Sequence, residues 1–312
     1  IVEGIISLGT IFLFIQMSQM LFRPLRHIAD KFNTLQMGMV AAERVFKLID
    51  RDEKINDGGT ISAEKIKGSI SFKDVNFSYV SGEQVLYEIN LDVKPGEKIA
   101  IVGSTGAGKS TIINLLSRFY ENETGMITID NISIKDFSIQ FLRKHVGVIL
   151  QDVFLFADTI YNNIVLFNSD VKKEDVYDAA KQIGVHEFIS SLPGGYQYNV
   201  KERGVMLSSG QRQLIAFLRV YLSNPSILVL DEATSSIDSY SEELIQKAIK
   251  KITEEKTAIV IAHRLSTIKN SDRIVVMDKG RVVEVGKHDE LVTIKGGYYS
   301  QLYQIQFLQE AV

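Results

Sequence analysis

The strongest chemical signal in the sequence is a glycine-rich stretch that ends in a lysine and a serine. An apolar run, 98–102, leads directly into Gly103, Ser104, Thr105, Gly106, Ala107, Gly108, Lys109 and Ser110, a full match to G-x-x-x-x-G-K-[ST]. The glycines let the backbone turn tightly around a phosphate chain, and the start of the following helix faces the same charge. Lys109 is expected to reach the β- and γ-phosphates, and the Ser110 hydroxyl to ligate Mg²⁺. A chance match in a chain of this length has odds on the order of one in a hundred.

Two adjacent acids supply the carboxylates that a magnesium–nucleotide site needs. Asp231 and Glu232 follow the apolar run 227–230. Consecutive residues of a strand point opposite ways, so the two side chains need different roles. Asp231 is expected to hold the Mg²⁺ shell, and Glu232 to polarise the attacking water as general base. Strand ends are also often acidic because they meet solvent, so the pair alone leaves both interpretations open.

The elements around these residues predict an α/β fold. Stretches 70–77 and 85–93 read as antiparallel strands bounded by turn residues. Runs 98–102, 226–230 and 257–261 read as buried strands, each followed by a helical pattern, which is typical of a parallel core. Helical patterns dominate between about 136 and 222, which indicates a helical subdomain inserted into the sheet-containing one. Residues 69–312 are therefore expected to form one domain.

The N-terminal part has a different character. No charged residue occurs from 4 to 22, close to the roughly 20 positions of a spanning helix, and Arg23, Arg26 and Lys31 follow at once. We expect residues 1–50 to be the end of a last transmembrane helix with its cytoplasmic extension, and 51–68 to be a linker. The polar residues in the run also permit a buried helix of a soluble protein.

Bulk composition excludes several classes of protein. The 312 residues contain no cysteine, so a disulfide framework and a thiolate metal site are both impossible. The formal net charge of −3 shows no basic excess, which argues against a nucleic-acid partner.

Further motifs follow the phosphate loop in a fixed order. Gln151 ends the run 148–151, and Ser208, Ser209, Gly210 and Gln211 lie in the stretch 207–213. After the acidic pair come Asp238, in 235–238, and His263, in 261–264, while Tyr79 lies upstream of the loop. This ordered set resembles the ATP-binding cassette (ABC) proteins. Stretches 157–164 and 201–204 and the leading helix are similar to the exporter branch of that family, and the resemblance covers nearly the whole chain.

The resemblance implies a P-loop NTPase domain with an ABC-type antiparallel β subdomain and an inserted α-helical subdomain, preceded by a transmembrane helix end. It implies ATP and Mg²⁺ as cofactors. It implies that Tyr79, residues 103–111 including Thr111, and Gln151 bind the nucleotide. Ser110, Gln151 and Asp231 would bind the metal. Lys109, Gln151, Glu232 and His263 would take part in ATP hydrolysis. Tyr79 would stack on adenine, and His263 would contact the transition state.

The same resemblance implies an assembly of two chains. Ser208, Ser209, Gly210 and Gln211 of one chain would close over ATP bound by another, and Asp238 would join the two sites. The expected partners are a second half-transporter, identical or different, an upstream transmembrane domain of the same protein, and a transported lipid, drug or peptide. The intact protein would be multi-pass in the cell (inner) membrane with the nucleotide-binding domain in the cytoplasm.

The sequence departs from the family pattern at one motif position, and two alternatives to an exporter ATPase remain open. Ser209 stands where the family usually has glycine, which is costly only if that residue needs a positive φ. A soluble cassette ATPase acting on DNA or ribosomes is disfavoured by the near-neutral charge and by the apolar segment 4–22. A membrane-tethered module that uses ATP as a structural ligand would differ from an enzyme in showing no turnover that depends on Glu232.

Overall fold

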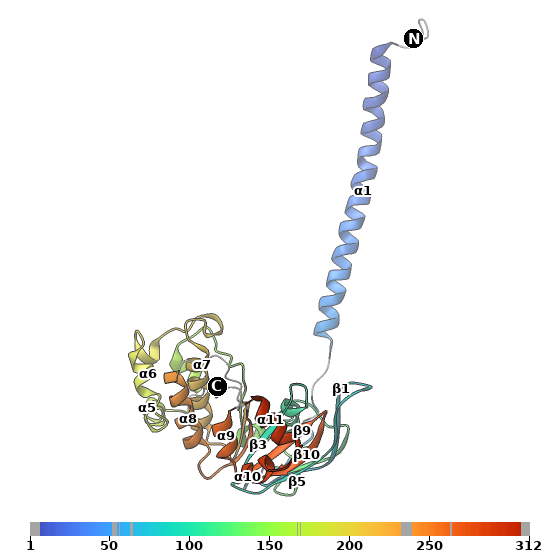
Figure 1. The fold of residues 1–312 in the computed structure, drawn as a ribbon. Helices are drawn as coiled ribbons and strands as arrows, with labels where there is room; N and C mark the ends of the chain where they lie inside the picture. Colours follow the sequence, from blue (N-terminus) through green and yellow to red (C-terminus); the bar gives the residue numbers. More distant parts are fainter. Residues whose placement is uncertain are drawn as a thin grey trace. The chain divides into compact units, whose positions relative to one another are not determined.

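The chain divides into two units, Ile1–Lys54 and Ile55–Val312, which are described separately. The computed structural model (Figure 1) describes residues 7–51, 55, 57–62, 65–166, 168, 170–231, 239–262 and 264–306.

The first unit is a single long helix, α1 (Leu8–Ile49). Ser7 caps its start by accepting a hydrogen bond from the Thr10 backbone N–H at 3.2 Å, and the helix continues through Pro24. The helix thus extends almost to residue 50, where the sequence predicted that the extension of the N-terminal helix would end. The membrane span expected over 4–22 is not confirmed. Within the described part of the chain, no helix combines the length and the apolar character needed to cross a membrane.

An antiparallel sheet of four strands, in the order β2-β1-β4-β5, opens the second unit. It consists of β1 (Ile70–Val80), β2 (Glu83–Val93), β4 (Thr124–Ile129) and β5 (Ile132–Ser133). The predicted antiparallel pairing of the first two strands is confirmed, with Ile70 opposite Val93.

The second sheet has six strands in the order β10-β9-β3-β8-β7-β6. They are β3 (Lys98–Gly103), β6 (Val146–Ile149), β7 (Ile227–Asp231), β8 (Thr257–Ile261), β9 (Arg273–Asp278) and β10 (Arg281–Gly286). Neighbours from β9 to β6 pair in parallel, and β10 is antiparallel to β9. The parallel α/β core expected from three apolar runs is thus confirmed.

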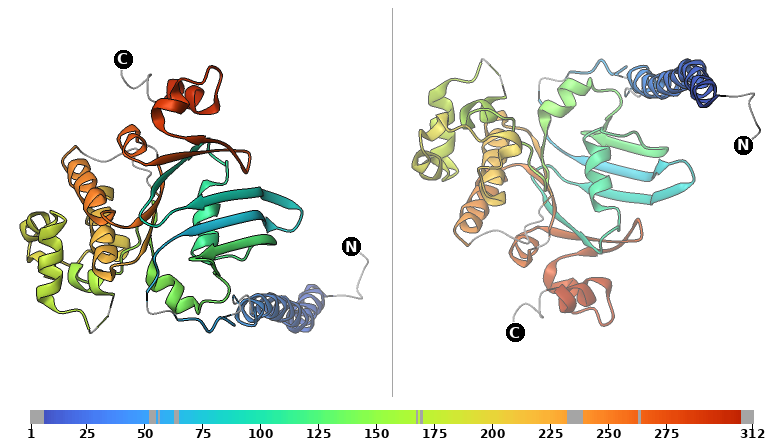
Figure 2. Two further views of the ribbon diagram at one scale, coloured as in Figure 1. Left: turned by 90° about the horizontal axis from the view of Figure 1, so that it is seen from below. Right: turned by 90° about the horizontal axis from the view of Figure 1, so that it is seen from above.

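Helices pack on both faces of this sheet, and most of them gather on the face away from β1 and β2 (Figure 2). The described helices of the second unit are α2 (Lys109–Leu116), α3 (Ile139–His145), α4 (Ile160–Val165), α5 (Lys173–Gln182), α6 (His186–Ser191), α7 (Ser209–Ser223), α8 (Ser239–Ile252), α9 (Leu265–Lys269), α10 (His288–Val292) and α11 (Tyr298–Gln306), with 3₁₀ turns at Gly195–Gln197 and Glu202–Gly204. The range 136–222 is mainly helical, but it also contains β6, which belongs to the six-stranded sheet.

Two apolar cores enclose the central strands. Along β3, Ile99 and Ile101 face a core shared with the antiparallel sheet and α2, whereas Ala100 and Val102 face a core shared with α4 to α8. Side chains alternate along a strand, so burial on both faces requires the continuous apolar runs seen in the sequence. These strands are therefore fixed from both sides.

A carboxylate joins the segment before β1 to the turn between β4 and β5. Asp130 accepts hydrogen bonds from the backbone N–H groups of Lys67 at 2.6 Å and Ser69 at 2.9 Å, from that of Gly68, and from the Ser69 hydroxyl. Burial acts to raise the pKa of Asp130, but these hydrogen bonds outweigh it, so the pKa lies below its ordinary value. The charged form is therefore the one that the fold stabilises.

We predict that Asp130→Ala lowers the free energy of unfolding by about 1–3 kcal/mol, because hydrogen bonds to a charged acceptor are lost. Urea unfolding at pH 7 measures the change, and Asp178→Ala, at an exposed ion pair with a 3.9 Å separation, serves as the control.

The pH dependence follows from the sign of the shift. A pKa depressed in the folded state contributes stability above the unfolded value, near 3.8, and loses it as the pH falls toward the folded value. The difference between wild type and Asp130→Ala should be constant near neutrality and shrink below about pH 4. A difference that grows on acidification contradicts this account.

Candidate nucleotide-binding site

The glycine-rich stretch forms the connection between β3 and α2, as the sequence predicted. Gly108 caps α2 with a φ of 94°. The positive φ favours glycine, and a Cβ on Gly108 would also lie 2.6 Å from the Leu86 Cδ2, so that the Leu86 side chain would have to shift. The loop closes on itself through the Ala107 N–H, which donates to the Ser104 carbonyl at 3.1 Å. Its backbone leads directly into the positive end of α2.

Lys109 is the buried cation of this loop. Its side chain is 8% exposed, and Nζ donates to the carbonyls of Gly103 at 2.8 Å and Ser104 at 2.9 Å. Burial lowers the pKa of Lys109, and the nearby Asp231 carboxylate partly opposes that shift. A cation held in this way at a helix N-terminus is suited to bind an anion such as phosphate.

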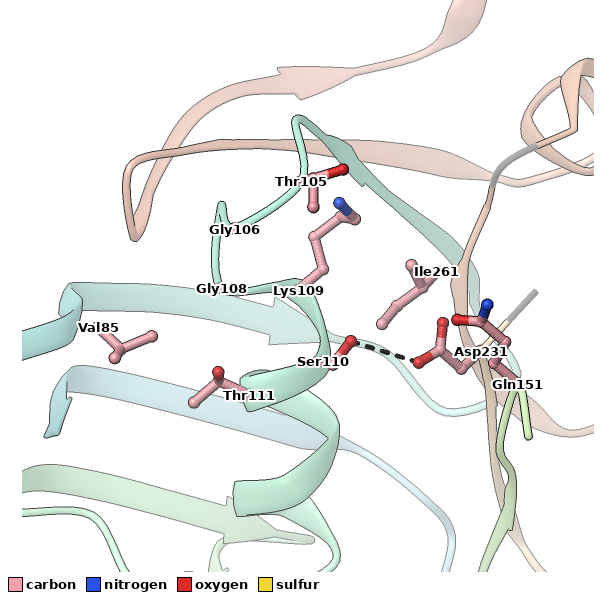
Figure 3. Close-up of a pocket in the computed structure, with 10 residues that line it drawn as sticks. All are labelled: Val85, Thr105, Gly106, Gly108, Lys109, Ser110, Thr111, Gln151, Asp231 and Ile261. Atoms are coloured by element: carbon pink, nitrogen blue, oxygen red, sulfur yellow. Dashed lines mark hydrogen bonds between the residues drawn. The ribbon is translucent and has the colours of Figure 1, made fainter. Parts of the chain in front are cut away.

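Oxygen ligands from three elements meet in front of the loop (Figure 3). The Ser110 hydroxyl, at the start of α2, donates to Asp231 Oδ2 at 3.3 Å, and Asp231 ends β7. Gln151, which follows β6, lies beside Asp231. The carboxyl ends of β3, β7 and β6 lie at one edge because the strands are parallel, which is where ligands bind in open α/β sheets.

These residues line an open pocket with a volume of about 460 Å³. Its lining consists of Val85, Thr105, Gly106, Gly108, Lys109, Ser110, Thr111, Gln151, Asp231 and Ile261. The structure thus brings together all three predicted metal ligands and most of the predicted phosphate loop. Val85 and Ile261 also line the pocket but were not predicted as site residues, since apolar strand residues carry no local signal for a ligand.

Tyr79 lies next to α2 at the end of β1. Its hydroxyl donates to Thr111 Oγ1 at 3.2 Å and accepts from Asn114 Nδ2 at 2.9 Å. The rings of Phe77 and Tyr120 pack edge-on against it, with centroids 4.7 and 4.9 Å away. The residue is 44% exposed, so these contacts hold it in place while part of it stays accessible, and it lies outside the lining of the phosphate pocket.

The predicted signature residues lie at the start of α7. Ser208 and Gln211 form a capping box: the Ser208 N–H donates to Gln211 Oε1 at 3.0 Å, and the Gln211 N–H to Ser208 Oγ at 3.2 Å. Ser209 is the first residue of α7 and does not have a positive φ, so its side chain is tolerated there. None of the four residues from 208 to 211 belongs to the lining of the phosphate pocket.

Gln151 borders a second hollow that reaches the signature residues. This hollow has a volume of about 550 Å³ and is lined by Gln151, Asp152, Val153, Phe154, Arg203, Val205, Ser209 and Arg212. Arg219 of α7 fixes the segment after Gln151, because Nη1 donates to the Phe154 carbonyl at 3.0 Å and Nη2 to Asn163 Oδ1 at 3.0 Å. Burial lowers the pKa of Arg219 to about 10. Gln151 therefore lies between the phosphate loop and α7.

Glu232, Asp238 and His263 lie outside the described residues. Asp231 directly precedes the first of them, and Ala262, which directly precedes His263, donates its N–H to the Ile101 carbonyl at 3.2 Å. Their proposed roles therefore rest on the sequence.

The sequence is similar to a known family and to individual transporters. A family model described as ABC transporter matches residues 86–235. A probable multidrug resistance ABC transporter ATP-binding/permease protein of Bacillus subtilis (strain 168) is 43% identical over 303 residues, covering 97% of this chain and 45% of that protein. An ATP-dependent lipid A-core flippase of Legionella pneumophila is 44% identical over 301 residues, covering 96% of this chain and 51% of that protein.

A solved structure is also similar over almost the full chain. A bacterial Atm1-family ABC exporter with ATP bound superposes with a TM-score of 0.78 at 36% identity, covering 98% of this chain and 54% of that one. This chain spans about half the length of the curated relatives it matches.

We predict that Tyr79→Ala weakens ATP binding roughly ten- to hundredfold, because base–aromatic stacking is worth about 1–3 kcal/mol. Tyr79→Phe keeps the ring and its edge-on neighbours and should stay within about threefold of wild type. Titration with a fluorescent ATP analogue measures both. Tyr240→Ala, at a more exposed tyrosine in α8, is the matched control. Equal affinity of Tyr79→Ala and wild type would show that Tyr79 is not the base platform.

Proposed function

The chain belongs to the ABC transporter family, and from this premise we propose that it binds and hydrolyses MgATP as the ATPase part of an exporter half-transporter. The observation that carries the proposal is the contact between the Ser110 hydroxyl and Asp231, directly beside the buried Lys109. This pairs a phosphate loop with the acidic end of a neighbouring parallel strand, the arrangement that P-loop NTPases use for Mg²⁺ and triphosphate.

The donor set fits Mg²⁺. Ser110, Asp231 and Gln151 present oxygen atoms, which this hard cation prefers. No group of three or more His, Cys, Asp or Glu side chains in the described part of the chain could hold a metal. That suits an ion bound through few protein ligands together with substrate phosphates. When bound, Mg²⁺ would neutralise charge that develops on the phosphates.

The other side chains of the site bind the nucleotide and take part in its hydrolysis. Lys109 orients the β- and γ-phosphates, and the N–H groups of 103–111 hold them against the start of α2. Glu232 accepts a proton from the attacking water, and His263 donates a hydrogen bond to the γ-phosphate as its charge increases. Tyr79 supports the adenine ring.

We further propose that each site is completed by a second chain. Ser208, Ser209, Gly210 and Gln211 are ordered by the capping box but lie outside the pocket lining, which supports a role toward the nucleotide of a partner. Asp238 would link the two sites. The partner is a second half-transporter, and the motif set allows it to be identical or different.

The remaining parts of the proposal concern the intact protein. The relatives are described as an ATP-binding/permease protein and a flippase, which supports an upstream transmembrane domain in the same polypeptide. We propose a multi-pass protein of the cell (inner) membrane with this nucleotide-binding domain in the cytoplasm. Closure and opening of the two domains would drive export of a lipid, drug or peptide, with no nucleic-acid partner.

We predict that Lys109→Ala weakens ATP binding by at least about tenfold, since charge-assisted hydrogen bonds contribute about 1.5–3 kcal/mol. Isothermal titration with MgATP on the 312-residue chain in mild detergent measures the loss. Lys247→Ala, at an exposed lysine paired with Glu243, controls for the change in net charge. ATP affinity that is undiminished in Lys109→Ala would overturn the proposed site.

We predict that Glu232→Gln lowers ATP turnover by about 10²–10⁴-fold while ATP affinity stays near that of wild type, because only the general base is removed. Release of inorganic phosphate measures turnover, and light scattering in the presence of MgATP tests whether the variant accumulates as a dimer. Equal and negligible turnover in wild type and variant, with ATP bound to both, would favour a module that uses ATP as a structural ligand.

A further inference from the structure

The segment that the sequence marked as a linker is bound to the nucleotide-binding domain. Residues 57–61, here called the strap, run alongside the turn that precedes α3. The Ile61 N–H donates to the Asp136 carbonyl at 3.0 Å, and the Ser138 N–H donates to the Ile61 carbonyl at 3.3 Å. This is a parallel β-bridge between Ile61 and Phe137. The strap thus forms backbone hydrogen bonds with a segment that is distant in the sequence.

Two further contacts fix the strap. Asp57 Oδ1 accepts a hydrogen bond from the Ile139 N–H at 2.9 Å, at the start of α3. At Gly59 the two backbones approach so closely that a Cβ would lie 2.0 Å from the Phe137 carbonyl oxygen. Real Cβ atoms essentially never come that near, so any side chain at this position must push the strap away from Phe137.

The same Phe137 carbonyl is held by a buried arginine. Arg118 is 2% exposed, and its Nη1 donates to the Phe137 carbonyl at 3.1 Å and to the Ile134 carbonyl at 3.4 Å. In return, Nη2 of Arg143 in α3 donates to the Arg118 carbonyl at 3.0 Å. The Arg118 backbone has a φ of 52°, unusual for a residue with a side chain. Such a conformation persists only where surrounding contacts fix it.

Arg118 follows the helix that starts at the phosphate loop. It comes two residues after α2, whose first residues are Lys109 and Ser110. An α2 of eight residues is about 12 Å long, and its buried face packs into the core between the two sheets. We expect a short helix packed in this way to be displaced as one body. A displacement at Arg118 therefore changes the position of the phosphate-binding amides at the other end.

We propose that Arg118 is a positioning residue of the nucleotide site and that it couples ATP binding to docking of the strap through the Phe137 carbonyl. The inference rests on the proposed ATP-binding function. Because coupling between two sites is reciprocal, ATP stabilises the docked strap and a displaced strap weakens ATP binding by the same factor. The chain that follows α1 would thus have its own connection to the nucleotide, separate from Gln151.

Hydrogen exchange gives the first test and needs no change in the strap. The 312-residue chain with Glu232→Gln, which prevents turnover, is compared with and without MgATP. Coupling predicts that the amides of Ile61 and Ser138 exchange about three- to tenfold more slowly with MgATP, and that Lys109→Ala abolishes this protection. Unchanged exchange at both amides while MgATP protects the phosphate loop would overturn the inference.

A double-mutant cycle gives the second test and separates coupling from simple support of the fold. Gly59→Ala, which displaces the strap, should weaken MgATP affinity about three- to tenfold in the wild-type background. Arg118→Lys keeps the charge but lacks the second donor of the fork, so in that background Gly59→Ala should change affinity by less than about twofold. Additive effects of the two substitutions would contradict the role of Arg118.

Two controls keep the outcomes distinct. Gly38→Ala adds the same methyl group to α1, where nothing lies within 4 Å, and should leave MgATP affinity unchanged. If Gly59→Ala lowers only the melting temperature and not the affinity, the strap is merely structural and the inference fails. If wild type itself does not bind MgATP, the proposed function fails instead, which separates the two results.

Discussion

The contact between Ser110 and Asp231 depends on the register of three parallel strands. Ile101 of β3 and Asp231 of β7 both lie opposite Ile261 of β8, so β7 ends level with Ile101, two residues before the end of β3. A slip of one residue would turn the Asp231 side chain to the other face of the sheet. The register is fixed because both faces of these strands are buried, each against a different core. The position of a single polar contact is thus set by apolar packing on both sides of it.

The same packing makes the charge of Lys109 useful. Burial takes its ammonium group out of water, which lowers its pKa, and the Asp231 carboxylate offsets only part of that effect. A triphosphate carries several negative charges. Because Lys109 is buried, where water screens charges less, a triphosphate is attracted to it more strongly than to an exposed lysine. The site therefore combines a cation and a carboxylate in one pocket, and Mg²⁺ is the bridging charge that such a pair can share with phosphate.

Much of this arrangement was predictable because its signals are local. The phosphate loop, the apolar run before Asp231 and the turns between strands are all encoded within a few residues, and each was found where the sequence placed it. The strand β6 shows the limit: its four residues form an apolar run too short to separate strand from helix by periodicity. Its identity comes from pairing with β7, which is a tertiary fact. The positions of Glu232, Asp238 and His263 stay predictions, whereas Gln151 and Asp231 do line one pocket.

The segment before β1 was hardest to interpret for a related reason. It lacks periodicity, and its attachments use backbone groups and single carboxylates whose partners are 61 to 82 residues away, such as Asp130 with Ser69 and Asp57 with Ile139. Hydrogen bonds of this kind leave no pattern in a sequence window. Their effect is nevertheless specific, because the Asp57 hydrogen bond connects the segment to the turn whose Phe137 carbonyl Arg118 also binds. With the phosphate loop at its start and Arg118 just beyond its end, α2 is constrained at both ends, which is why we expect a displacement of one end to be felt at the other.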